Sequence, residues 1–79
     1  MMPTYIKSNV DATVNVISEA IQSADYTYEN EELTLTYAGG TRYAYTKVPR
    51  FLFHGLQESA SKGKFINNYV IGKFKFNRV

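Results

Sequence analysis

Two tyrosines separated by one residue, Tyr43 and Tyr45, have the types and spacing that most directly suggest chemistry. Residues two apart in a β-strand lie on the same face, so their rings would be neighbours. Aromatic rings on an open sheet stack on unpaired bases, and each stack contributes about 1–3 kcal/mol. The alternative is that both rings fill the core, because a small two-layer domain needs large side chains where its helix packs. The sequence leaves both interpretations open.

Basic residues are concentrated in the second half of the chain and are interleaved there with aromatic residues. Residues 1–40 contain one base and six acids, whereas residues 41–79 contain eight bases and one acid. Such a surface attracts a polyanion, and cations beside aromatic rings are typical of proteins that bind single-stranded nucleic acid. The candidate nucleic-acid-binding residues are Arg42, Tyr43, Tyr45, Lys62, Lys64, Asn67, Lys73, Lys75 and Arg78.

Three alternatives to this interface stay open. The aromatic residues of segment 62–79 could fill the core while the lysines solvate the surface and protect an edge strand. The acidic first half of the chain could neutralise the basic second half across the fold. The amide of Asn67 could read a base or could simply hydrogen-bond the backbone near a helix end.

The composition argues against catalysis and against a bound cofactor. The chain has no cysteine and a single histidine, His54, so it lacks the clustered ligands of a transition-metal site. The segment Ser61-Lys62-Gly63-Lys64 combines groups that can surround an anion, but it lacks P-loop spacing, and a turn that ends a helix is the alternative. We therefore expect no catalytic residue, no metal and no other cofactor.

No segment predicts insertion into a membrane or export across one. Nowhere do about 18 consecutive apolar residues occur, and no apolar core of a signal peptide follows Lys7. We expect a cytoplasmic protein without a membrane partner. It would be a monomer or a weak dimer formed through an edge strand at residues 73–78.

Alternating apolar and polar residues predict the sheet that must position the candidate residues. The alternation covers residues 19–28, 32–38 and 41–47. An acidic turn joins the first two runs, and Gly39-Gly40 joins the last two, as in antiparallel hairpins. The start of the first strand stays open, because the apolar spacing over 14–24 would also suit a short helix. These features predict an antiparallel three-stranded meander.

Helical spacing follows the sheet, so the predicted fold class is α+β. Apolar residues recur at three- and four-residue spacing after Pro49, which predicts a helix over 49–60. A second short helix or turn is expected over 65–71, and a C-terminal edge strand or extended tail over 73–79. Residues 1–15 would form an N-terminal arm or a short added strand, ahead of a single domain over 16–79.

The order of several short motifs resembles the KTSC domain, a small module found at the C-terminus of some lysyl-tRNA synthetases and as free-standing bacterial and phage proteins. The motifs are Tyr-x-Tyr at 43 and 45, Val48-Pro49, and Ser-Lys-Gly followed by Phe-x-Asn within 61–67. The similarity covers residues 17–76. It implies a domain of uncertain function, for which the link to tRNA synthetases suggests RNA binding, and it assigns no catalytic residue.

Two classes of function follow from these observations. The first is a non-catalytic module that binds tRNA-like or single-stranded RNA through the basic, aromatic C-terminal half. The second is a protein–protein interaction or regulatory protein, of phage or mobile-element origin, that acts on a host protein. Salt dependence separates them, because phosphate contacts weaken steeply as salt rises whereas an aromatic protein interface responds less.

Overall fold

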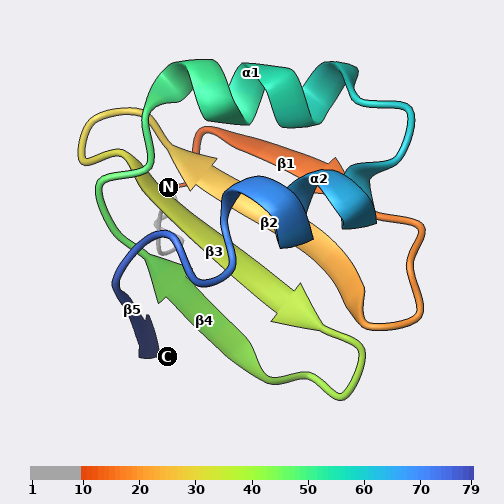
Figure 1. Ribbon diagram of the computed structural model, residues 1–79. Coiled ribbons are helices and arrows are strands. Elements are labelled where there is room, and N and C mark those ends of the chain that lie inside the picture. The colour runs from red at the N-terminus through yellow and green to blue at the C-terminus, as the bar shows by residue number, and fades with distance from the viewer. Residues whose placement is uncertain (1–9) are drawn as a thin grey trace, which may run out of the picture.

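A five-stranded antiparallel sheet carries two helices on one face in the computed structural model, which describes residues 10–79 (Figure 1). The strands follow the order of the chain, and each pairs with the next. The elements are β1 (Ala12–Asn15), β2 (Ile21–Thr27), β3 (Glu32–Tyr37), β4 (Arg42–Tyr45), α1 (Arg50–Glu58), α2 (Lys62–Tyr69) and β5 (Phe76–Arg78).

The predicted meander of three strands is only the centre of this sheet, since one further strand lies at each edge. β1 has four residues and β5 has three, so neither is long enough to show a clear alternation on its own. Their pairing with β2 and β4 defines them as strands. The α+β class is confirmed, and the strand count is corrected from three to five.

The boundaries of several predicted elements also change. The first predicted strand begins at Ile21 rather than at residue 19, and no helix forms in the alternative range 14–24. The second helix begins at Lys62, three residues before the predicted start. β5 occupies the end of the predicted edge strand. Residues 1–9 of the expected arm lie outside the described residues, and β1 lies in the part of the arm that follows them.

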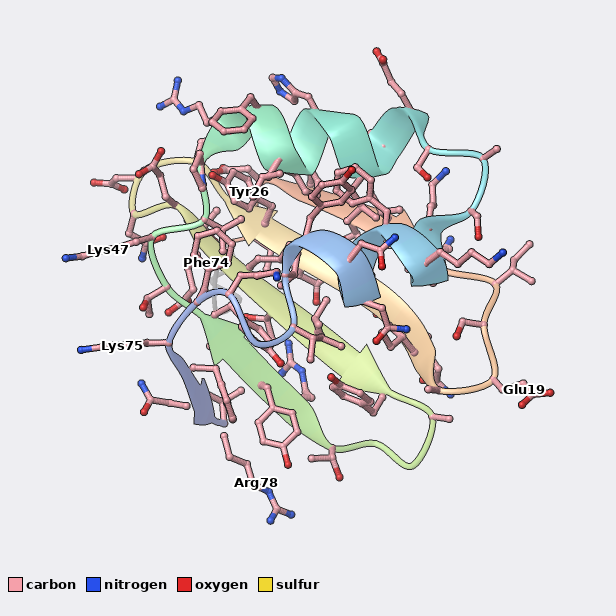
Figure 2. All side chains as sticks on the ribbon, in the orientation of Figure 1. Glu19, Tyr26, Lys47, Phe74, Lys75 and Arg78 are labelled. Atoms are coloured by element: carbon pink, nitrogen blue, oxygen red, sulfur yellow. The ribbon has the colours of Figure 1, made fainter. Side chains whose placement is uncertain are left out.

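The core lies between the sheet and the two helices, with Tyr26 of β2 and Phe53 of α1 at its centre. Both side chains are fully buried, and their rings stack at 4.6 Å between centroids. The Tyr26 hydroxyl donates a hydrogen bond to the carbonyl oxygen of Val48, so burial leaves the phenol satisfied. Figure 2 shows Tyr26 under the start of α1. The stack therefore ties the first helix to the sheet.

Gly55 of α1 lies against Phe65 of α2. A Cβ atom at Gly55 would be 2.9 Å from Cζ of the Phe65 ring, which is closer than carbon atoms can pack. Phe65 in turn contacts Tyr69, with ring centroids 4.7 Å apart. Glycine costs about 1 kcal/mol relative to alanine inside a helix, and the close approach of the Phe65 ring explains why a larger residue would not fit there.

Candidate nucleic-acid interface

Three aromatic side chains, which we call the aromatic row, cross β3, β4 and β5 on the face of the sheet that carries the helices. Tyr37 and Tyr43 meet edge to face at 5.5 Å, and Tyr43 and Phe76 do so at 5.2 Å. Strand register places them, because Tyr43 pairs with Leu35, and Phe76 pairs with Tyr45. Tyr37 and Tyr43 are half-buried, and Phe76 is 51% exposed. The row therefore presents accessible ring surface at one side of the sheet.

The two tyrosines singled out from the sequence have different environments. Tyr45 is 3% exposed and belongs to the core, where it also lies 5.2 Å from the Phe76 ring. Tyr43 keeps accessible surface in the aromatic row. For Tyr45 the structure matches the alternative of a core residue, so Tyr43 alone of the pair can offer a ring to a ligand in this conformation.

Two of the candidate cations lie beside the aromatic row. Arg78 pairs with Tyr43 across β4 and β5, so its side chain starts on the same face of the sheet. Lys75 immediately precedes β5, and its side chain projects from the molecule at the other end of that strand from Arg78 (Figure 2). Both are exposed. Phe76 is therefore flanked along the chain by cations that can reach an anionic ligand.

Arg42 lies on the opposite face of the sheet, where it pairs with an acid. Its guanidinium is 3.5 Å from the Asp25 carboxylate, which also accepts a 2.7 Å hydrogen bond from the Thr13 hydroxyl. Among residues 10–79 this is the only ion pair, and it links the acidic half of the chain to the basic half at a single point. The other cations among residues 10–79 form no direct ion pair with an acid.

The candidates on α2 are separated from the aromatic row. The helix begins beside the loop between β1 and β2, since a Cβ atom at Gly63 would be 3.2 Å from Cβ of Ser18. Figure 1 shows this end of α2 on the far side of the molecule from β5. Lys62 donates to the carbonyl oxygen of Ser59 at 2.8 Å, and Lys64 and Asn67 are exposed. These three residues do not join Tyr43, Lys75 and Arg78 in one contiguous surface.

Lys73 lies in the turn between α2 and β5, where its backbone N–H donates to the carbonyl oxygen of Val70. Its side chain is exposed. The sequence candidates did not include Tyr37, which belongs to the row, or Lys47, which follows β4. Tyr37 could have been found from its alternation with Leu33 and Leu35 together with the register that the Gly39-Gly40 turn imposes, which brings it to Tyr43.

Away from the aromatic row, the described residues form a hollow near the start of α2 but no cluster of metal ligands. Among residues 10–79 no group of three or more His, Asp and Glu side chains could hold a metal ion. A hollow of about 330 Å³ near the start of α2 is lined by Asn15, Ile17, Ala60, Ser61 and Lys62, a set without an acidic or histidine side chain. None of the helices in this part of the chain is long and apolar enough to cross a bilayer.

Burial of Tyr45 makes the stability of the domain sensitive to alkaline pH. Desolvation, reinforced by a hydrogen bond with Tyr37, raises the pKa of Tyr45 well above its ordinary value of 10.0. The unfolded chain loses this proton near pH 10 and the folded chain does not, so ionisation stabilises the unfolded state as pH rises above 10. The free energy of unfolding should therefore fall from pH 10 upward.

Urea unfolding of wild type and Tyr45→Phe at pH 8, 10 and 11 measures this loss. The variant should lose less stability than wild type between pH 10 and 11, and Tyr69→Phe, which removes an exposed phenol, should follow wild type. Burial also raises the pKa of Tyr26, so a smaller alkaline loss should persist in Tyr45→Phe. Equal losses in wild type and Tyr45→Phe would contradict the assignment.

Comparison with known proteins identifies similar sequences in two settings. The family model of the KTSC domain matches residues 17–74. A lysine–tRNA ligase of Nostoc punctiforme is 34% identical over 59 residues, which are 75% of this chain and 10% of the ligase. A protein of Tsukamurella paurometabola is 37% identical over 60 residues, 76% of this chain and 90% of that protein. The chain thus spans about a tenth of the ligase and nearly all of the second relative.

A solved structure has the same fold. The crystal structure of a KTSC domain protein from Yersinia pestis superimposes with a TM-score of 0.77 at 26% sequence identity. The similarity covers 86% of this chain and 96% of that protein. The helices and the sheet that position the aromatic row therefore match a known arrangement.

Proposed function

The chain belongs to the KTSC domain family, and from this premise we propose that it is a non-catalytic module that binds unpaired RNA through the aromatic row and its flanking cations. One observation carries the proposal, namely the accessible row of Tyr37, Tyr43 and Phe76 with Arg78 and Lys75 beside it. Unpaired bases stack on such rings whatever their sequence, and cations contact the phosphates.

The choice of RNA as the ligand is supported by the kind of protein in which similar segments occur. Several matching proteins are lysine–tRNA ligases, in which the similar segment makes up 10% of the protein. An appended module that contacts RNA would add affinity to an enzyme whose substrate is a tRNA. The free-standing form would use the same surface on its own.

The charge distribution supports the same ligand. Lys75 and Arg78 are exposed, and neither forms an ion pair among the described residues. Rings without cations would suit an apolar partner, and cations without rings would bind any polyanion. Their combination favours unpaired nucleic acid, which offers bases and phosphates together.

Fluorescence anisotropy tests the proposal directly. A labelled tRNA and a short single-stranded RNA are titrated with the protein at about 50 and 200 mM salt, and phosphate contacts should weaken the affinity as salt rises. Arg78→Gln should reduce the affinity and the salt dependence. Arg50→Gln is the matched control, because this substitution removes the same charge at a residue outside the aromatic row. The Arg50 guanidinium lies over the Tyr28 ring, 5.5 Å from its centroid.

Absence of binding at the lower salt concentration would reject the RNA proposal. The second candidate, a module that docks on a host protein, would then be favoured by exposed apolar side chains outside the row. Phe51 of α1 is 71% exposed, and Ile17 before β2 is fully exposed. A Phe51→Ser variant that loses a partner captured by wild type would support that function.

A further inference from the structure

Lys47, just after β4, has a backbone conformation that does not suit its side chain. Its φ is 59°, in the left-handed region, which only glycine, and to a lesser degree asparagine and aspartate, adopts readily. Among the described residues only Glu31 shares this property without being glycine. Non-glycine residues with such backbone angles cluster at functional sites, so Lys47 is a candidate for a functional side chain.

Lys47 lies next to Lys75 in the fold although the two are far apart in the sequence. The preceding residue, Thr46, donates its backbone N–H to the carbonyl oxygen of Lys75 at 2.9 Å, and its hydroxyl contacts the same oxygen at 3.5 Å. Figure 2 shows the side chains of Lys47 and Lys75 projecting toward the same side of the molecule. These hydrogen bonds of Thr46 thus bring the two lysines together where β4 ends and β5 begins.

Neither ammonium group forms a direct ion pair with a carboxylate among residues 10–79. The carbonyl oxygen of Glu31 accepts the backbone N–H of Val48 at 2.9 Å, which brings Glu31 near, yet its carboxylate forms no ion pair with Lys47. Both lysines are exposed. With no direct ion pair to an acid, both exposed ammonium groups can contact an anionic ligand.

We propose that Lys47 and Lys75 together bind one phosphodiester group of the RNA strand whose base stacks on Phe76. The inference rests on the proposed function and adds to it a phosphate site with a residue absent from the sequence candidates. Lys75 directly precedes Phe76, so the phosphate next to the stacked base lies within reach of the long lysine side chains. Contact with this phosphate would explain why position 47 carries a lysine although its backbone conformation favours glycine.

Lys47→Gly tests the site because its effects on folding and on binding have opposite signs. Glycine accepts the positive φ, so the melting temperature should be equal to or above that of wild type. Loss of one of the two cations should lower the magnitude of the slope of log affinity against log salt by up to about 0.7 for a single-stranded RNA, since Lys75 still contacts the same phosphate. Lys47→Asn, which also tolerates this φ, should behave in the same way.

Two controls complete the experiment. Lys47→Arg keeps the charge and should keep the slope of wild type, whereas Arg50→Gln removes one charge elsewhere and should also keep it. An unchanged slope in Lys47→Gly or Lys47→Asn would overturn the phosphate site while the RNA-binding function stands. Failure of wild type to bind RNA would reject the function itself, and the two failures are therefore distinguishable.

Discussion

Replacing Tyr43 and Phe76 together by leucine is expected to weaken the binding of a short single-stranded RNA by at least about 30-fold, since each base stack contributes about 1–3 kcal/mol. Leucine keeps apolar volume over Tyr45, so the sheet stays covered while the flat ring surface is lost. Anisotropy titration at constant salt measures the effect. The slope against salt should stay close to that of wild type, because the phosphate contacts remain.

Phe51→Leu is the matched control for the aromatic row. Phe51 is more exposed than Phe76, at 71% against 51%, but it lies on α1 and contacts no ring of the row. Its replacement should leave RNA affinity unchanged. Equal losses in the control and in the double variant, or no loss in the double variant, would show that the rings of the row do not stack on bases.

The sequence predicted the parts of the fold that have a strong local pattern. Leu33, Leu35 and Tyr37 alternate along β3, and the adjacent Gly39-Gly40 turn sets its pairing with β4. β1 and β5 were harder to recognise, because three or four residues carry little periodicity and only the neighbouring strand defines them. Short edge strands are thus a property of the assembled sheet rather than of their own sequence.

The sequence named candidate site residues, but it did not predict how the fold arranges them. Alternation places Tyr43 and Tyr45 on the same face of the sheet, but the two differ in exposure. Tyr45 is buried in the core, whereas Tyr43 keeps accessible surface. Lys62 and Lys64 of α2 are close in sequence to Lys75, which precedes β5, yet Figure 1 shows the start of α2 and β5 on different sides of the molecule. Lys47 carried no signal, since nothing in the sequence marks a lysine with positive φ.

The residues at the centre of the core and the residues of the aromatic row lie over different parts of the sheet. Residues that stabilise the fold, such as Tyr26 and Phe53, lie between the sheet and α1, whereas the aromatic row lies over β3 to β5. Phe53 forms no ring contact with Tyr37, Tyr43 or Phe76, so substitutions at Phe53 and in the row should have nearly additive effects. This independence makes binding and stability separately measurable in one protein.

Phe53→Ala is expected to lower the free energy of unfolding by about 3–5 kcal/mol, the usual cost of removing a fully buried phenylalanine. The ring stacks on Tyr26 at 4.6 Å and meets Tyr28 edge to face at 6.2 Å, so alanine leaves a cavity at the centre of the core. A domain of this size has a total stability on the order of 4–12 kcal/mol. The melting temperature should fall by at least about 12 °C.

Phe51→Ala, two residues earlier on the same helix, separates the loss of packing from the loss of a phenylalanine as such. Phe51 is 71% exposed, so its replacement removes little buried surface and should change the free energy of unfolding by less than about 1 kcal/mol. Urea unfolding followed by circular dichroism compares both variants with wild type. Because α1 is held to the sheet through the face that carries Phe53, equal costs at the two positions would contradict the packing of this helix.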